Sequence, residues 1–161
     1  MTSPLRLIIR PFSEGDPAEA ARLLSSSRAE YLRWFGPFQF DATVIGNLAF
    51  SAVRDQWFTI EVEQGGGYQF AGFYTLRGVD EGFADPMYGV FIGEAFSGKG
   101  IARLTVAHAE AQCRLNGWKT LLLKADPRNR RAFDIYTRAG FQYVRTDPKN
   151  GDQVLAKTVL P

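Results

Sequence analysis

The stretch from residue 87 to residue 116 reads MYGVFIGEAFSGKGIARLTVAHAEAQCRLN. Its first six residues are apolar and suit a strand, and its last sixteen repeat apolar residues at helical spacing. Between them, Gly98, Lys99 and Gly100 form a glycine-rich turn that opens directly into the expected helix. Backbone N–H groups at the start of a helix are unpaired and lie at its positive end, where phosphate binds well. The stretch therefore predicts a strand–turn–helix unit with an anion site at the turn.

The glycine turn fits neither of two common nucleotide-binding motifs. A P-loop needs a Ser or Thr directly after its lysine to hold magnesium, whereas Gly100 follows Lys99 here. The dinucleotide fingerprint needs three spaced glycines early in the chain and an acidic residue about 20 residues later. From the glycines alone, a plain flexible turn before a helix is an equally good interpretation. Lys99 and Arg103 add positive charge at the turn, and this suits a small polyanion better than a nucleic-acid duplex.

The rest of the sequence predicts one layered domain over residues 1–161. Alternating or β-rich apolar runs predict strands, and helical apolar spacing beside capping residues such as Asp41 and Asn129 predicts helices. The expected strands cover residues 5–12, 57–63, 68–76, 87–92, 120–125, 141–145 and 154–159, and the expected helices cover residues 18–27, 44–49, 101–116 and 129–139. A meander followed by strand–helix–strand crossovers predicts a mixed sheet covered by helices, of the α/β or α+β layered class.

Composition excludes several classes of protein. Apolar residues make up 45% of the chain and charged residues 22%, as in globular domains. Cys113 is the single cysteine and His108 the single histidine, so neither a disulfide framework nor a cysteine-based metal cage is expected. The net charge of +2 gives no argument for nucleic acid. A basic-then-apolar leader and an apolar run of about 20 residues are both missing from the sequence, so we expect a cytoplasmic protein without membrane association.

A second motif, NRRAFDIYTRAGF, occupies residues 129–141. Together with GKGIARL at residues 98–104, it resembles the GNAT superfamily of acyl-CoA-dependent N-acyltransferases, whose patterns are Gln/Arg-x-x-Gly-x-Gly/Ala and Asn-x-x-Ala-x-x-x-Tyr-x-x-x-Gly-Phe. The two motifs have the family's order and separation, and the resemblance covers residues 87–144 well and the whole chain loosely. It implies a mixed, mostly antiparallel sheet of six to seven strands, flanked by helices, with a splayed central strand.

The resemblance also implies acetyl-CoA as the acyl donor, without a metal. The coenzyme-binding positions that it implies are the splayed strand end, the glycine turn and two residues of the second motif, namely Phe91, Ile92, Ser97, Gly98, Lys99, Gly100, Ile101, Ala102, Arg103, Asn129 and Tyr136. The sequence departs from the family where the leading Gln or Arg falls on Ser97. A side-chain contact to phosphate is therefore weakened there, whereas a cradle of backbone N–H groups does not depend on it.

In this family an amine attacks the acetyl thioester directly, without a covalent enzyme intermediate. Tyr136 matches the tyrosine that protonates the departing sulfur in many members, and a neutral hydroxyl can donate at pH 7. Tyr136 also fits a simple core role, because it shares a helical face with Ala132 and Ile135.

The general base has no fixed motif. We expect Glu81 or Asp80, in the loop before residue 87, to serve as the base; Glu61 and Glu63 are alternatives, and a solvated acidic loop without a catalytic role is another. His108 shares helical spacing with Ile101, Leu104 and Leu115, which places it on an apolar stripe as a packed residue.

Aromatic residues gather in the region expected to bind the acceptor amine. Tyr31, Trp34 and Phe35, together with Arg77, suit a ring with a few polar groups. The segments 31–38 and 76–82 resemble family members of polysaccharide and amino-sugar pathways, so we expect a small-molecule amine, an amino sugar or sugar nucleotide, as acceptor. A protein N-terminus, a polyamine and an antibiotic remain alternatives. A non-catalytic acetyl-CoA sensor or partner subunit is an alternative to an enzyme. The aromatic residues could also serve only to close the core. The resemblance to the family implies a possible homodimer.

Overall fold

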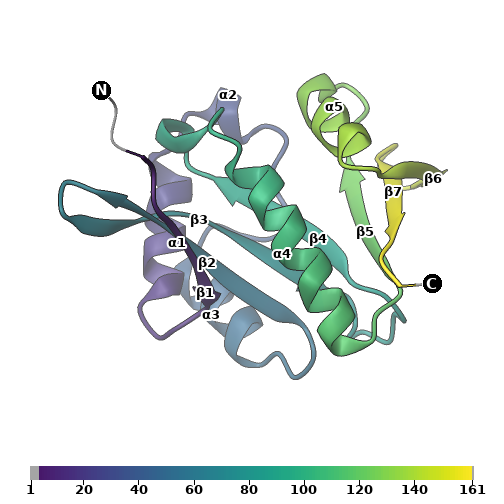
Figure 1. The fold of residues 1–161 in the computed structure, drawn as a ribbon, viewed down its shortest axis with the longest axis horizontal. Helices are drawn as coiled ribbons and strands as arrows, with labels where there is room; N and C mark the ends of the chain where they lie inside the picture. Colours follow the sequence, from purple (N-terminus) through teal and green to yellow (C-terminus); the bar gives the residue numbers. More distant parts are fainter. Residues whose placement is uncertain (1–3, 161) are drawn as a thin grey trace.

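Seven strands form one sheet in the order β1-β2-β3-β4-β5-β7-β6 in the computed structural model, which describes residues 4–160 (Figure 1). Neighbouring strands are antiparallel except β4 and β5, which are parallel. The strands are β1 (Leu7–Pro11), β2 (Gln56–Gln64), β3 (Gly67–Arg77), β4 (Met87–Ile92), β5 (Thr120–Ala125), β6 (Gln142–Thr146) and β7 (Gln153–Thr158). The helices are α1 (Asp16–Ser26), α2 (Ala29–Leu32), α3 (Ala42–Phe50), the short 3-10 helix η1 (Glu94–Phe96), α4 (Ile101–Asn116) and α5 (Arg130–Arg138). The expected mixed, mostly antiparallel sheet is confirmed.

Local signals in the sequence fix most helix ends. The Asp41 carboxylate accepts hydrogen bonds from the N–H groups of Thr43 and Val44, at 2.8 and 3.2 Å, and so caps α3. Helix α4 ends at Gly117, whose φ of 73° lies in the left-handed region that favours glycine. Helix α1 starts earlier than the apolar spacing indicated, because Pro17 fits the first turn of a helix.

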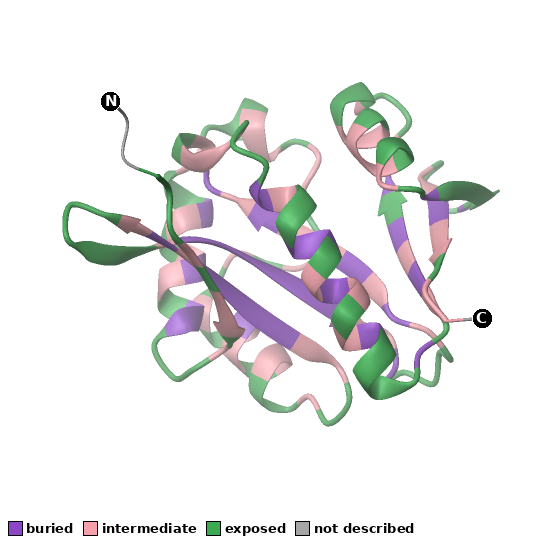
Figure 2. Cartoon of the chain, in the orientation of Figure 1, coloured by how far each residue is buried: buried purple, intermediate pink, exposed green. Residues whose placement is uncertain are grey.

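Helices cover both faces of the sheet. Successive residues of a strand point to opposite faces, so Trp57 and Phe73 face one layer while their neighbours Phe58 and Tyr74 face the other. On the first face the core includes Ala20 and Leu24 of α1, Ile45 of α3, and Phe91 of β4. On the second face it includes Val106, Ala109 and Cys113 of α4. Figure 1 shows α4 crossing the near face, with α1 and α3 behind the sheet, and Figure 2 shows the buried residues along the central strands between them.

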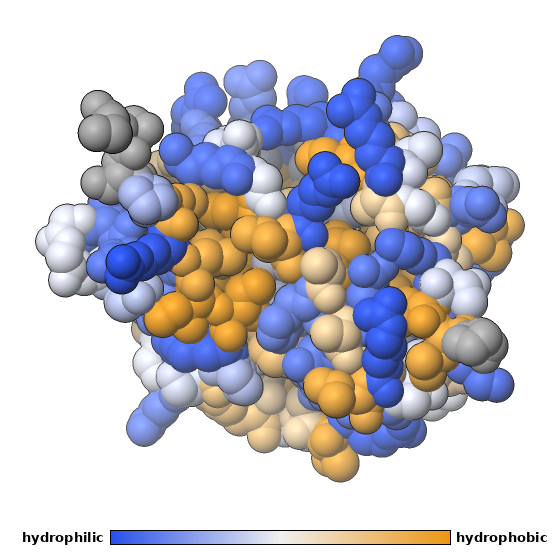
Figure 3. All heavy atoms as spheres, in the orientation of Figure 1, coloured by the Kyte–Doolittle hydropathy of each residue, from blue (hydrophilic) through white to orange (hydrophobic). Residues whose placement is uncertain are grey.

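The apolar stripe of α4 differs from the expected one. Its buried residues are Ile101, Thr105, Val106, Ala109 and Cys113, whereas Leu104 and Leu115 are 55% and 80% exposed. The expectation for those two leucines was wrong because the buried face of α4 is turned toward Thr105, Ala109 and Cys113. Figure 3 shows hydrophobic residues at the surface beside α4.

His108 points toward the sheet, as its packed role required. Its Nδ1 is hydrogen-bonded to the Tyr74 hydroxyl on β3, and its ring meets Phe58 edge-on at 4.9 Å between centroids. Burial lowers the pKa of His108, so the ring stays neutral and serves packing.

Strand β4 pairs with β3 along its whole length but with β5 only at its start. Its six residues, from Met87 to Ile92, pair with β3 from Arg77 to Gly72 in the antiparallel direction. On the other side, within the described residues, the parallel pairs are Met87 with Leu122 and Tyr88 with Leu123. The two strands separate beyond Tyr88, and Figure 1 shows them diverging toward the glycine turn and α5. We call this separation the fork.

Strands β3 and β4 approach so closely near the fork that the sequence requires a glycine there. A Cβ on Gly72 would lie 2.2 Å from the Phe91 carbonyl oxygen, whereas a Cβ on Gly89 would lie 3.5 Å from the Thr75 Oγ1, an ordinary contact. Gly72→Ala should therefore destabilise the fold by about 2 kcal/mol, since a backbone atom cannot yield without moving the strand. Gly89→Ala is the matched control and should change stability much less; urea unfolding measures both. Equal losses for the two variants would contradict the close approach at Gly72.

Candidate active site

The glycine turn has the geometry of an anion cradle. Gly98 and Gly100 have φ values of 75° and 81°, a conformation that residues with a Cβ rarely adopt. A Cβ on Gly100 would meet no atom within 4 Å, so the backbone is open at this point. The first hydrogen bond of α4 runs from the Leu104 N–H to the Gly100 carbonyl, which leaves the N–H groups of Ile101, Ala102 and Arg103 free at the start of the helix. These groups fit the phosphates of a coenzyme.

Ser97 is held by the short helix in front of the turn. Its Oγ donates a hydrogen bond to the Glu94 carbonyl at 2.9 Å, and its N–H donates to the same oxygen at 3.2 Å. The Ser97 hydroxyl therefore donates its proton to a backbone oxygen of the protein itself. The turn carries no long cationic side chain at this position, and the Lys99 and Arg103 side chains are exposed around it.

The fork leaves backbone N–H groups of β4 without a strand partner. The Gly93 N–H donates to the Ala71 carbonyl at 2.7 Å, so Gly72 and Ile92 form a non-hydrogen-bonded pair of the β3–β4 ladder. Alternation along the strand then directs the N–H groups of Val90 and Ile92 away from β3, into the fork, and that of Phe91 toward β3. Ile92 was expected here from the sequence and Val90 was not, although residues two apart on a strand share an edge.

Tyr136 of α5 lies beside the point where the strands separate. Its ring meets Tyr88 edge-on at 6.1 Å and Phe141 at 5.9 Å between centroids. Burial raises the pKa of Tyr136 to about 12, and a hydrogen bond with Tyr88 acts in the opposite direction. The hydroxyl therefore keeps its proton at neutral pH and is a competent donor at the fork.

Asn129 sits at the start of the same helix. Its Oδ1 accepts a hydrogen bond from the Ala132 N–H at 3.2 Å and caps α5. The amide NH₂ is left to donate, so the cap and a ligand contact are compatible.

The carboxylates expected as general base lie at the other end of β4. Asp80 and Glu81 precede the first residue of β4, whereas the glycine turn follows its last residue; a strand of this length spans about 16 Å. The Asp80 carboxylate accepts hydrogen bonds from the N–H groups of Val53, Arg54 and Asp55. These bonds, the one from Arg54 most strongly, lower the pKa of Asp80. The position of both residues and the pairing of Asp80 therefore argue against the expected base.

The alternative carboxylates on β2 are already ion-paired. Glu61 contacts Arg10 at 3.0 Å, and Glu63 contacts Arg6 at 3.4 Å. Arg77 does not join the fork either. It ends β3 opposite Met87 and places its guanidinium 5.6 Å from the ring centroid of Phe38 and 5.7 Å from that of Trp57.

The aromatic residues of the expected acceptor region separate into two groups. Phe35 packs inward, 5.1 Å from Phe91 between centroids, and belongs to the core. The Tyr31 hydroxyl donates to the Ile92 carbonyl at the end of β4. Trp34 lies between two guanidinium groups, that of Arg33 at 4.5 Å and that of Arg128 at 5.2 Å from its ring centroid. Tyr31 and Trp34 therefore remain candidates for acceptor contacts at the open end of the fork.

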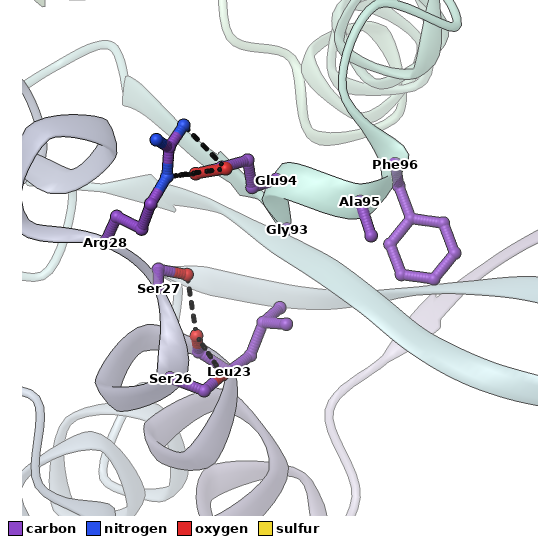
Figure 4. Close-up of a pocket in the computed structure, with 8 residues that line it drawn as sticks. All are labelled: Leu23, Ser26, Ser27, Arg28, Gly93, Glu94, Ala95 and Phe96. Carbon is purple, nitrogen blue, oxygen red and sulfur yellow. Dashed lines mark hydrogen bonds and ion pairs between the residues drawn. The ribbon is translucent and has the colours of Figure 1, made fainter.

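A small cavity of about 200 Å³ separates the end of α1 from η1. The Arg28 guanidinium and the Glu94 carboxylate form an ion pair at 2.9 Å beside it (Figure 4). The pair ties the α1–α2 junction to the short helix that precedes the glycine turn. This ion pair could not be expected from the sequence, because its partners lie far apart in the chain.

Two further properties concern metals and membranes. Within residues 4–160, the His, Cys, Asp and Glu side chains form no group of three that could hold a metal ion. Of the helices in that same range, none is both long and apolar enough to span a bilayer.

Comparison with known proteins identifies the fold and the family. The family model "Acetyltransferase (GNAT) domain" matches residues 6–142, while curated protein sequences give no significant match. Among solved structures, spermidine N-acetyltransferase from Vibrio cholerae, in complex with CoA and spermine, superposes with a TM-score of 0.76 at 17% identity over 94% of this chain and 95% of that one.

Two other solved structures share the fold at similar identity. The ribosomal-protein-S18-alanine N-acetyltransferase from Escherichia coli has a TM-score of 0.70 at 16% identity over 97% and 96% of the two chains. The aminoglycoside acetyltransferase AAC(6′)-Ib, in complex with coenzyme A, has a TM-score of 0.70 at 17% identity over 95% of each chain. With the cradle, the fork and a family model that covers most of its length, the chain belongs to the GNAT acetyltransferases, enzymes that take their acetyl group from acetyl-CoA without a metal.

Proposed function

We propose that this protein transfers the acetyl group of acetyl-CoA to a primary amine by direct attack of the amine on the thioester carbon. The observation that carries the proposal is the fork, where the N–H groups of Val90 and Ile92 and the Tyr136 side chain converge beside Tyr88. Acetyl-CoA supplies an activated acetyl thioester. The chain supplies the anion cradle, donors for a carbonyl oxygen and a proton for a departing sulfur.

Each residue group has a separate task in this proposal. The free N–H groups at residues 101–103 hold phosphate, and the Asn129 amide contacts the coenzyme arm. The N–H groups of Ile92 and Val90 donate to the oxygen on which negative charge develops, and they need no reorganisation because the ladder with β3 fixes them. The Tyr136 hydroxyl protonates the thiolate. Its presence favours an enzyme over a non-catalytic sensor.

Tyr136→Phe tests the proton donor directly. The substitution removes one hydroxyl and keeps the ring that packs on Tyr88 and Phe141, so acetyl-CoA should raise the thermal midpoint as it does in the original protein. Turnover should fall roughly ten- to a thousandfold, the usual range for losing an acid–base group. Free-thiol release at saturating substrates measures turnover. Unchanged turnover would remove Tyr136 from the mechanism.

The amine passes its proton to solvent rather than to a loop carboxylate. Asp80 and Glu81 lie at the far end of β4, and Glu61 and Glu63 are occupied by arginines. Glu81→Gln should therefore leave kcat within about twofold of the original value, since only a surface charge changes. A tenfold or larger loss at an unchanged thermal midpoint would restore Glu81 as the base.

We propose an amino sugar carried on a nucleotide as the acceptor. Tyr31 and Trp34 offer aromatic surface at the open end of the fork, where a sugar ring can stack. The guanidinium groups of Arg33 and Arg128 flank Trp34. Arg128 is paired with Asp126, so the positive charge of Arg33 is the one that attracts a diphosphate and repels a polyamine. The three fold relatives act on different amines according to their names, so the fold alone does not select the acceptor.

An acceptor panel with one variant tests this choice. Free thiol release is measured with a nucleotide-linked amino sugar, the same free amino sugar, spermidine and a peptide with a free N-terminus. We expect the highest kcat/KM for the nucleotide-linked sugar, and Arg33→Gln should lower it about tenfold while changing the free sugar less than threefold. A preference for spermidine or the peptide would contradict the proposed acceptor.

A further inference from the structure

Helix α5 places a guanidinium group against the glycine turn. A Cβ on Gly98 would lie 3.6 Å from Nη2 of Arg131, so the Arg131 side chain reaches from α5 across to the turn before α4. Arg131 also acts on Tyr31: burial raises the pKa of that tyrosine, and the positive charge of Arg131 opposes the rise. The guanidinium therefore lies between the turn and α2, at the open end of the fork.

Arg131 has no carboxylate to neutralise it. Two other arginines of this region are paired, Arg128 with Asp126 at 2.7 Å and Arg138 with Asp134 at 3.3 Å. Among residues 4–160, no carboxylate lies within ion-pair distance of Arg131, and its donors have no hydrogen-bond acceptor in that range. A free planar guanidinium beside unpaired N–H groups is suited to bidentate binding of phosphate.

The need for such a group arises at Ser97. The hydroxyl of Ser97 donates to the Glu94 carbonyl, and a serine is too short to reach a phosphate held by the N–H groups of α4. The turn therefore has its backbone donors but lacks a long cationic side chain of its own at this position.

We infer that Arg131 binds the pyrophosphate of the coenzyme and takes the place of the side-chain contact missing at Ser97. The inference rests on the proposed function, because it assumes the coenzyme in the cradle. Arg131 is a binding residue that contacts phosphate from the α5 side, while the N–H groups of α4 contact it from the other. Binding of the coenzyme then bridges the two sides of the fork.

Binding of three ligands to the full chain locates the contact. Acetyl-CoA carries the pyrophosphate and a 3′-phosphate, dephospho-acetyl-CoA keeps only the pyrophosphate, and acetyl-pantetheine has neither. Titration calorimetry with Arg131→Ala should show about tenfold weaker binding of both acetyl-CoA and dephospho-acetyl-CoA. Acetyl-pantetheine should bind the variant and the original protein equally.

Arg130→Ala is the matched control. It removes one positive charge from the adjacent residue of the same helix, which is also exposed, and it should change acetyl-CoA binding less than threefold. Arg131→Lys keeps the charge without the fork of donors and should bind between Arg131→Ala and the original protein. A steady-state assay should show the loss in KM for acetyl-CoA, with kcat at saturation nearly unchanged.

Three results would overturn the inference. The first is unchanged binding by Arg131→Ala, and the second is a loss that disappears with dephospho-acetyl-CoA, which would assign Arg131 to the 3′-phosphate. The third is an equal loss in Arg130→Ala, which would show general attraction rather than a contact. Failure of the original protein to bind acetyl-CoA is a different outcome, since it would overturn the proposed function itself. Circular dichroism of each variant checks that α5 is intact.

Discussion

Strand β4 pairs with β5 through only two of its residues, Met87 and Tyr88. The candidate active site depends on the separation of the two strands beyond these residues. Strand β4 is held by β3 along its whole length, and β5 is equally held by β7 from Thr120 to Ala125. Each half of the sheet is therefore stable without the other beyond Tyr88. The N–H groups of Val90 and Ile92 have lost their strand partner, and buried backbone donors are costly to leave unpaired. Hydrogen-bonding capacity is thus available at one defined place for a ligand.

Tyr88 joins the elements around the fork. Its hydroxyl is hydrogen-bonded to the Thr105 Oγ1 of α4 at 2.7 Å, and its ring contacts Tyr136 of α5. Complete burial raises the pKa of Tyr88 far above its ordinary value, so this hydroxyl stays neutral. The last paired residue of β4 consequently fixes both helices that carry the site. Tyr88 therefore contacts both the helix that follows the glycine turn and the helix that carries Tyr136.

The sequence predicted what local chemistry determines. Asp41, Gly117 and Asn129 mark helix ends through their own side chains or backbone freedom, and the structure confirms all three. Tyr136 was singled out because the second motif is contiguous, and its role as proton donor stays a prediction. Asp80 and Glu81 stay a prediction for the general base, but the backbone hydrogen bonds that Asp80 accepts from Val53, Arg54 and Asp55 could not be read from the sequence, because they join segments far apart in the chain. Leu104 and Leu115 were misplaced because spacing alone does not define which side of a helix packs on the sheet.

Ser97 and Arg131 illustrate a limit of motif comparison that has a physical origin. A motif assigns each contact to one sequence position, but an anion responds only to where donors and charges lie in space. The glycines and the helix start cannot move, since left-handed backbone and unpaired N–H groups belong to the turn itself. A cationic side chain has no such restriction and can reach the turn from any element that borders it. The backbone part of the cradle is therefore readable from residues 98–103, whereas its charged part becomes visible only when α5 is placed beside α4.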